Sequence, residues 1–569
     1  MVTANRDSVE EDGRHNIGKS LHANEPSIID LLPQLENGCQ VRDILFDEVS
    51  EALQDNSRLA RKLEALVVLR KSLNAHRGGI NHKGAVGKIL TKDDTDKLVT
   101  KDTIEECVVT PLKTGVFISD NAVKCECAKI LFSTTSYLDT DVCVALFDTD
   151  TLRSLLLLVE YSAGNRGNTY IEEEIWVATV SIFRNLLMII EIPFDISRQL
   201  LNFVCNKYDC VAVDFCHAFI TKVILPKIAQ NPAAGTYLVQ SGHHMHMCRK
   251  ATTYLASVVA NVRDYAILSK VCATLVSISE HKFGIDLLLE TNCINDVMRL
   301  ALSVVSRYEL MLKDQGLYYH GKDMTMREHI TPQNHQLSFE ALSVISKVAF
   351  TAHRRQISAL LDLGVAEVLV KVLNCPLSST LVRTRSANTL GNLGCESETE
   401  VQVIIDADAF PILVRTFQEF TEQNTRVEAA YAICACASKA NRSQVGYIIS
   451  CTSRSDPLGS NTCMALLCDM MDFVCKSDPC NEGNLRLCRV VLNALDNILA
   501  IGVRESKIHK LPENPYGRLF IEHQGDVKLA KITAFPDYHI ATRATQISRI
   551  FFNRPRLWNS VNLEAVYNI

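Results

Sequence analysis

The sequence is poor in residues that break helices or form tight turns. Its 569 residues include only 15 prolines and 24 glycines, which argues against long disordered linkers and against an all-β fold with many turns. Apolar residues make up 47% of the chain, yet it has no run of about 18 apolar residues that could cross a bilayer. The net charge is only −6, so composition gives no general reason to bind nucleic acid or anionic membranes.

The 21 cysteines are scattered and form no CxxC pair; Cys125 and Cys127 form a CxC, as do Cys434 and Cys436. Many lie on apolar helix faces, such as Cys272, Cys434 and Cys436. No secretory apolar segment opens the chain. We therefore expect free thiols in a reducing compartment, the cytosol or nucleus, where most of them serve as small core residues.

The sequence lacks the motifs that hold nucleotides, metals or catalytic nucleophiles. Neither GxSxG, HExxH, a P-loop nor GxGxxG stands on a suitable strand or helix. His243, His244 and His246 lie close to Cys248, but zinc sites usually need two separated ligand pairs and no second pair is nearby. We therefore expect no cofactor, no metal and no enzymatic activity.

Apolar residues instead recur with helical spacing along most of the chain. A phrase of two aliphatic residues, an acidic or polar residue, a turn and an apolar helix repeats, most clearly at Asp362 and Asp406, which are 44 residues apart; Ser450 follows after another 44. Armadillo and HEAT units have periods of about 40–47 residues. Since one unit cannot bury its apolar face alone, we predict an all-α, armadillo/HEAT-like, right-handed superhelical solenoid of about ten repeats with a concave groove.

The same pattern predicts the domain organisation. We expect a disordered N-terminal tail over 1–25, a solenoid over 26–555 and a C-terminal tail over 556–569. A weaker copy of the phrase lies at Glu290, and the next copy, at Asp362, follows after 72 residues instead of 44. This excess predicts an insertion at about 307–336.

Several passages resemble the importin-α armadillo family. TRSANTLGNLG at 384–394 resembles the third helix of its repeats, which carries a Trp-x-x-x-Asn pair, and TRVEAAYAI at 425–433 is similar to the family's TRKEAAWAI. NALDNILAIG at 493–502 and the segment 520–552 resemble the last two repeats. The resemblance is good over about 338–552 and fainter upstream.

The resemblance implies a function. In that family, Trp and Asn side chains line the groove: indole faces hold the stems of cargo lysines, Asn amides fix the cargo backbone, and rim acids attract basic peptides. The resemblance therefore implies a non-catalytic nuclear import adaptor, cytoplasmic and nuclear, that binds basic nuclear localisation signals. Importin-β and the nuclear export receptor for importin-α would be further partners, and neither nucleic acid nor membrane would be one.

The resemblance also implies cargo-binding positions. Seven residues take them in our alignment: Asn185, Asn392 and Asn497 at the Asn of the ladder, Ser181 and Asn388 four residues earlier, Tyr431 at a Trp position, and Glu428 at a rim acid.

The sequence departs from the family at several of its functional positions. Of its two tryptophans, Trp176 falls off the ladder and Trp558 lies beyond the last repeat. Ile189 replaces the aspartate that would bind the main cargo lysine, and Lys347 at a ladder position would repel basic cargo. The arginine-rich arm that binds importin-β is missing from 1–30. These departures keep a second hypothesis open: a catenin-like armadillo scaffold that no longer binds classical nuclear localisation signals.

Overall fold

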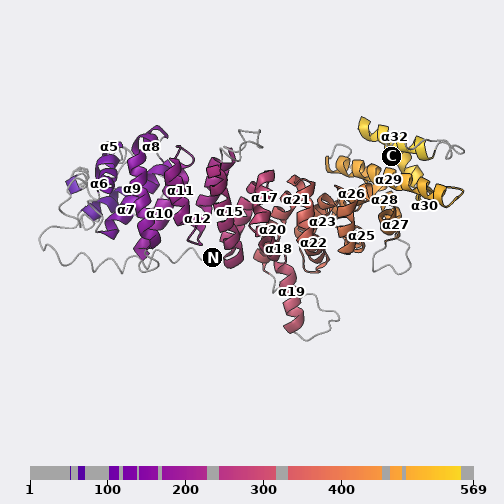
Figure 1. Cartoon of the computed structure of the whole chain (residues 1–569), viewed down its shortest axis with the longest axis horizontal. Helices are drawn as coiled ribbons and strands as arrows, with labels where there is room; N and C mark the ends of the chain where they lie inside the picture. Colours follow the sequence, from indigo (N-terminus) through magenta and orange to yellow (C-terminus); the bar gives the residue numbers. More distant parts are fainter. Residues whose placement is uncertain are drawn as a thin grey trace, which may run out of the picture. The chain divides into compact units, whose positions relative to one another are not determined.

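The structure of the protein is a computed structural model (Figure 1). It describes residues 51–52, 62–70, 101–114, 120–137, 140–164, 170–226, 242–314, 331–451, 462–476 and 482–552. Every regular element in these ranges is helical, and none of these helices has the length and apolar character needed to span a bilayer. The chain divides into two compact units, an N-terminal unit (Met1–Ala251) and a C-terminal unit (Thr252–Ile569).

The C-terminal unit is built from three-helix repeats in which the third helix is the longest (Figure 1). In chain order the repeats are α17 (Lys282–Glu290), α18 (Cys293–Ala301) and α20 (Pro332–Thr351); α21 (Arg354–Asp362), α22 (Val365–Asn374) and α23 (Thr380–Leu393); α24 (Glu398–Asp406), α25 (Ala409–Glu419) and α26 (Gln423–Lys439); α27 (Arg442–Ser450), α28 (Cys463–Lys476) and α29 (Glu482–Ile508); and α30 (Pro515–Glu522), α31 (Gly525–Thr533) and α32 (Tyr538–Phe551). Helix α16 (Tyr265–Ile278) precedes them. This arrangement confirms the predicted all-α repeat fold.

Helices of the same kind stack on one another from repeat to repeat. The third helices α20, α23, α26, α29 and α32 pack in that order, with α16 before them, and the first helices α17, α21, α24 and α27 do the same. Fully buried alanines let the third helices approach closely, among them Ala341, Ala387, Ala430, Ala494 and Ala544. Because each third helix packs on the next, all of them contribute to one common surface.

A residue with left-handed backbone joins the first and second helices in four of these repeats. The residues are Asn292, Gly364, Asp408 and Gln524, with φ of 58°, 82°, 59° and 58°. Each directly precedes the second helix of its repeat. The turns predicted from the repeated phrase are therefore confirmed. At each turn the chain changes direction sharply through this left-handed conformation, which glycine adopts without strain and other residues adopt less readily.

The predicted insertion at 307–336 is described in part. An additional helix, α19 (Ser303–Asp314), extends into it, and α20 begins at Pro332. Residues 315–330 lie outside the described residues, as do the predicted tails at 1–25 and 556–569.

The N-terminal unit shows the same stacking of like helices. Its helices are α5 (Lys101–Ile104), α6 (Thr110–Thr114), α7 (Asn121–Tyr137), α8 (Thr140–Leu146), α9 (Thr149–Gly164), α10 (Tyr170–Leu186), α11 (Phe194–Val204) and α12 (Cys210–Ala218), with π-helical segments at Glu105–Val109 and Phe219–Ile224. Helix α15 (Gly242–Asn261) contains the boundary between the units. Helices α7, α10 and α12 pack in order, and α9 packs on α11.

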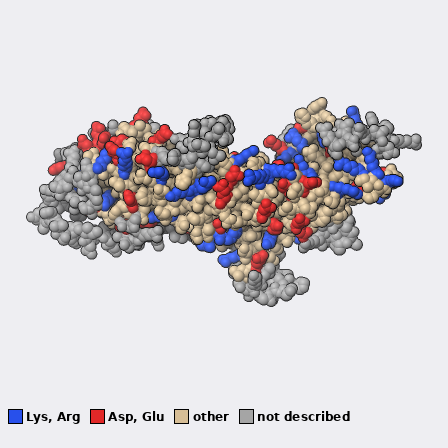
Figure 2. Space-filling view, in the orientation of Figure 1, with Lys and Arg blue, Asp and Glu red and all other residues tan. Residues whose placement is uncertain are grey.

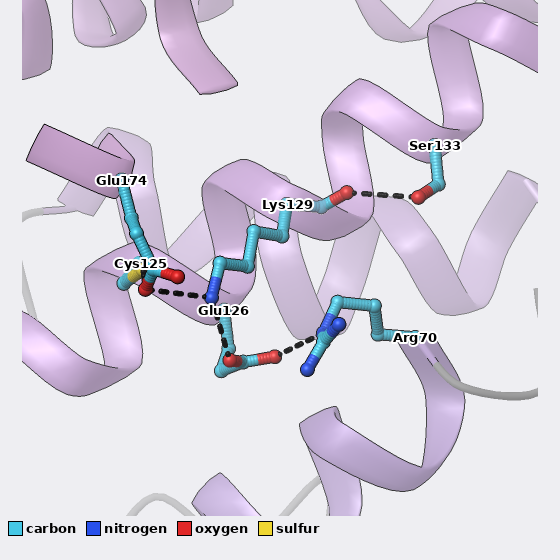
Figure 3. A network of polar contacts seen from close by, with 6 residues as sticks. All are labelled: Arg70, Cys125, Glu126, Lys129, Ser133 and Glu174. Atoms are coloured by element: carbon cyan, nitrogen blue, oxygen red, sulfur yellow. Dashed lines mark hydrogen bonds and ion pairs between the residues drawn. The ribbon is translucent and has the colours of Figure 1, made fainter. Parts of the chain in front are cut away.

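A chain of ion pairs links three helical segments of this unit (Figure 3). Arg70 Nε donates to Glu126 Oε2 on α7 at 2.6 Å, and Lys129 Nζ lies 3.4 Å from Glu126 Oε1. The same ammonium lies 2.8 Å from Glu174 Oε2 on α10. Each cation of this network therefore faces a carboxylate, and the network joins neighbouring helices of the stack.

The ion pairs shift the pKa values of their members. Burial opposes the charge on Glu174, but hydrogen bonding and attraction to Lys129 outweigh it, so the pKa of Glu174 lies below its usual value. Burial also opposes the charge on Lys129, and the hydrogen bond to Glu174 with neighbouring negative charge raises the pKa of Lys129 nonetheless. Burial raises the pKa of the adjacent Cys125 thiol to about 12, so this thiol is neutral.

Glu174→Gln should lower stability near neutral pH by up to about 1 kcal/mol, because it removes the charged partner of Lys129 in a half-buried, partly screened pair. The folded pKa of Glu174 is depressed, so its contribution is present above the unfolded value of about 4.3 and is lost as the pH falls through the folded pKa. Urea unfolding followed by circular dichroism should show a difference between wild type and variant that shrinks below about pH 4. A difference that does not change with pH would contradict the pairing.

Close packing of α29 on α30 depends on Gly502. Asn514 Oδ1 accepts hydrogen bonds from the backbone N of Tyr516 and Gly517, each at 3.0 Å, and so caps α30. Its Nδ2 donates to the carbonyl oxygen of Leu499 at 2.9 Å. A Cβ at Gly502 would overlap Asn514 Oδ1, so only glycine leaves room for this cap.

Gly502→Ala should therefore lower stability by roughly 2 kcal/mol, through loss of the cap and of a buried hydrogen bond. Gly446→Ala in α27 is the matched control, because a Cβ there meets nothing closer than Tyr516 Oη at 3.7 Å. It should raise stability by up to about 1 kcal/mol, the helix-propensity gain of Ala over Gly. Thermal unfolding of the two variants tests this, and shifts of the same sign would contradict it.

Candidate functional site

The third helices of the C-terminal unit form an open pocket of about 400 Å³. Its lining comes from four of them, with Val276 from α16, Ser343, Ser346, Lys347 and Phe350 from α20, Arg385, Asn388 and Asn392 from α23, and Arg486 from α29. The pocket is thus a direct product of the stacking of third helices. Its volume lies within the range of small-ligand sites, about 300–1,000 Å³.

Asn388 lies at the centre of a polar ladder that crosses three repeats. Its Oδ1 accepts from Ser346 Oγ on α20 at 3.4 Å and from Asn392 Nδ2 on its own helix at 3.3 Å. Its Nδ2 donates to Glu428 Oε2 on α26 at 2.7 Å. The amide is therefore held in a fixed orientation by groups from both neighbouring helices.

Asn392 lies one helical turn further along α23 and is 7% exposed. Its Oδ1 accepts from Tyr431 Oη on α26 and from Arg486 Nη2 on α29, both at 3.4 Å. Its Nδ2 donates to Asn388. The two asparagines are thus linked to each other and to both repeats that follow.

Each of these two amides keeps one unused donor. A side-chain amide has two N–H hydrogens and an oxygen that accepts two hydrogen bonds. In Asn388 and Asn392 both acceptor positions and one N–H are occupied. The second N–H of each amide has no protein partner in the described part of the chain. Both residues line the pocket, so these hydrogens can bond to the backbone carbonyls of a bound chain.

Arg486 bridges three successive third helices. Its guanidinium carbon lies 3.8 Å from the centroid of the Tyr431 ring, and it also donates to Asn392. A guanidinium over an aromatic face at this distance is a cation–π contact. The importin-α resemblance implies that the face of Tyr431 binds a cargo lysine. In this protein Arg486 covers that face.

The pocket is cationic. Its lining holds Lys347, Arg385 and Arg486 and no carboxylate. Lys347 pairs with Glu280 at 3.3 Å, at a carboxylate that is 55% exposed, and Arg385 lies over the Phe339 ring at 5.2 Å. Within the described ranges, neither Arg385 nor Arg486 has a carboxylate at ion-pair distance. This differs from the N-terminal network, where every cation faces an acid (Figure 3).

Figure 2 shows Lys and Arg side chains intermingled with Asp and Glu on the visible face over the C-terminal unit, so this face as a whole carries no single sign of charge. An unneutralised cluster within mixed surroundings raises the local concentration of anions at one place.

The structure brings together four of the seven residues predicted to bind cargo. Asn388 and Asn392 line the pocket, and Glu428 and Tyr431 hold them from α26. Lys347, which the alignment places at a ladder position, lies in the lining. Glu428 itself is not in the lining, because its carboxylate is turned to Asn388.

Asn497 is used within the fold. It lies on α29, and its Nδ2 donates to the carbonyl oxygens of Ala437 and Ala440 at 2.8 and 2.9 Å. Both amide hydrogens therefore stabilise the end of α26, and none remains for a ligand.

The two predicted residues of the N-terminal unit are occupied or buried. Asn185 Nδ2 donates to Thr135 Oγ1 at 3.2 Å and to Ser136 Oγ at 3.1 Å on α7, which uses both hydrogens. Ser181 is 6% exposed within α10. Trp176, predicted to fall off the ladder, is fully buried and donates from Nε1 to Asp209 Oδ2 at 2.8 Å.

Sequence reasoning did not identify Arg385 and Arg486. Arg385 lies inside the segment that resembles importin-α, but the functional positions that the resemblance implies there are amides, aromatics and acids. Arg486 lies outside the passages quoted for the resemblance, and its contact with Asn392 joins residues 94 positions apart. The one signal in the sequence was Lys347, a cation at a position where a basic ligand would need none.

No protein-family model and no curated protein matches this chain. Among solved structures, an engineered protein aligns over 89% of this chain and 98% of its own, with a TM-score of 0.52 and 15% identity. A designed armadillo repeat protein aligns over 52% of this chain and 98% of its own, with a TM-score of 0.38 and 17% identity. Another, in complex with the peptide (KR)4, aligns over 53% and 99%, with the same score and identity. The first match shows the fold alone.

Asn388→Asp should destabilise the C-terminal unit by about 1–2 kcal/mol, because it replaces an N–H donor at 2.7 Å from Glu428 with a second carboxylate. In a Glu428→Gln background the same change should cost much less. Asn493→Asp, at an exposed position of α29, is the control and should be close to neutral. Urea unfolding midpoints measure all of these. An equal loss of stability on Asn388→Asp in wild type and in the Glu428→Gln variant would contradict the contact between Asn388 and Glu428.

Proposed function

We propose that this chain is a non-catalytic protein-interaction scaffold that holds an extended peptide of a partner protein along the third helices of its C-terminal unit. The observation that carries the proposal is the pair of pocket-lining amides, Asn388 and Asn392, each with one N–H to spare. Hydrogen bonds to the peptide backbone give affinity, and neighbouring pockets give specificity.

The spacing of the two amides suits an extended chain. Residues four apart on a helix are separated by about 6 Å along its axis. Alternate residues of an extended peptide are separated by about 6.6 Å. Asn388 and Asn392 can therefore bond to carbonyls two residues apart on one peptide, which then lies along α23.

The remaining polar groups of the pocket support binding rather than catalysis. Ser343 Oγ donates to the carbonyl oxygen of Phe339 at 2.8 Å, and Ser346 Oγ donates to Asn388. Neither hydroxyl is paired with a general base, which a serine nucleophile would require.

The importin-α resemblance supplies a second candidate function: an import adaptor that carries basic nuclear localisation signals from cytosol to nucleus, with importin-β and an export receptor as partners. Glu428 and Tyr431 favour it, because a carboxylate and an aromatic ring in one cluster are groups that hold lysine. Lys347, Arg385 and Arg486 oppose it, since they repel a basic peptide and Arg486 covers the Tyr431 ring. The scaffold therefore fits the pocket better.

Selection of a random octapeptide display library on the full chain tests the scaffold. We expect an enriched set of peptides whose affinity, measured by fluorescence anisotropy, falls about tenfold in Asn388→Ala, the effect of about one buried hydrogen bond. Asn374→Ala, at an exposed position of the second helix α22, is the matched control and should bind as wild type does. Equal affinities for both variants would exclude peptide binding at these amides, as would failure to enrich any peptide from this library and from one with a fixed central phosphoserine.

A labelled octapeptide of alternating Lys and Arg separates the two candidates. The scaffold predicts no saturable binding near physiological salt, because Arg385 and Arg486, which have no carboxylate partner among the described residues, repel the basic peptide. Tight binding that is weakened by Glu428→Gln and strengthened by Arg486→Ala would instead establish the groove of an import adaptor.

A further inference from the structure

We propose that the cationic pocket recognises phosphoserine or phosphothreonine in the bound peptide. The proposal rests on the peptide-binding function above and adds the chemistry of the ligand. It is carried by the three cations that share the pocket with the amides Asn388 and Asn392.

The charge of the pocket matches a phosphate group. Arg385 and Arg486 have no carboxylate partner among the described residues, and Lys347 has one only at the exposed Glu280. A phosphorylated side chain carries a charge of about −1.5 to −2 and three acceptor oxygens. It can therefore engage several cations at once, whereas a carboxylate has one charge and two oxygens. Guanidinium groups are well suited to this, because their planar N–H donors bind phosphate in pairs.

The cations lie beside the amides along the path of the peptide. Arg385 is on the same face of α23 as Asn388, one turn before it, and Arg486 contacts Asn392. A peptide held by the two amides therefore has a guanidinium near each end of the held stretch. Its phosphorylated side chain can enter the pocket without displacing the backbone from its hydrogen bonds.

Arg486 can exchange its present contacts for a phosphate. Its partners in the structure are the Tyr431 ring and the neutral oxygen of Asn392. A guanidinium binds phosphate through two parallel N–H donors and opposite charge, whereas its contact with Asn392 is a single hydrogen bond to a neutral oxygen. Movement of Arg486 to a phosphate therefore gains a stronger contact, and it also exposes the ring of Tyr431 to the peptide.

Two acids and one aromatic ring define the surroundings. Glu428 is bound to Asn388 and Glu280 to Lys347, and neither is part of the lining. Phe350 is 73% exposed and does line the pocket. We expect its ring to cover an apolar side chain next to the phosphorylated residue.

The test uses the full chain and three libraries of labelled octapeptides with random flanks and a fixed central phosphoserine, serine or glutamate. We expect the phosphoserine library to be retained at least about tenfold better than the serine library, with retention falling as salt rises. Equal retention of the phosphoserine and serine libraries would overturn the proposal. Retention of the glutamate library equal to that of phosphoserine would also overturn it, since phosphate would then not be distinguished.

Variants locate the effect. Arg385→Gln with Arg486→Gln should reduce retention of the phosphoserine library to that of serine, and Arg504→Gln is the control because it removes the same charge from an exposed position of α29. Arg486→Lys keeps the charge without the planar donors and should give intermediate retention, which guards against a folding defect in the double variant. Equal losses in the Arg504→Gln control would overturn the proposal.

The outcomes also separate this proposal from the one on which it rests. If the serine library binds in a manner that depends on Asn388 and phosphate adds nothing, the phosphate site is excluded and the scaffold remains. If none of the three libraries binds, both are excluded.

Discussion

The packing of each third helix on the third helix of the next repeat is the interaction on which the rest of the C-terminal unit depends. Its contacts recur at the period of the repeats. Ser346 contacts Asn388 over 42 residues, Thr384 contacts Thr425 over 41, and Asn388 contacts Glu428 over 40. Because the helices stack in this order, polar residues from distant parts of the chain form one ladder, and the side chains that the ladder does not use line the pocket.

The stacking of like helices places cations in two electrostatic settings, one with a carboxylate partner and one without. In the N-terminal unit, cations between helices are neutralised: Arg70 and Lys129 alternate with Glu126 and Glu174, and the depressed pKa of Glu174 shows that the pair favours the charged forms. At the pocket of the C-terminal unit, the guanidinium of Arg385 lies over an aromatic ring and that of Arg486 contacts an aromatic ring and a neutral oxygen, and neither has a carboxylate partner among the described residues. Paired cations join helices, whereas unpaired cations at a pocket are available to a ligand.

The repeat fold could be predicted from the 44-residue period and the helical spacing of apolar residues, since both reflect burial, which acts locally. The cluster of Asn388, Asn392, Glu428 and Tyr431 could be predicted because these residues lie in neighbouring repeats at a fixed register. The loss of both donors of Asn185 and Asn497 could not, because it depends on which hydroxyls or carbonyls the adjacent helix presents. The place of Arg486 could not be predicted either, because it reaches over a whole intervening helix. The positions of the cations at this pocket are therefore harder to predict from the sequence than those of Asn388 and Asn392.

The central claim is that unneutralised arginines and free amide donors of stacked third helices form one ligand site. Arginine footprinting with phenylglyoxal and mass spectrometry, with and without a peptide selected on the full chain, tests it most directly. Bound peptide should protect Arg385 and Arg486 from modification, while Arg504, which is exposed on α29, should react equally in both samples. Unchanged reactivity of Arg385 and Arg486 under saturating peptide would contradict it.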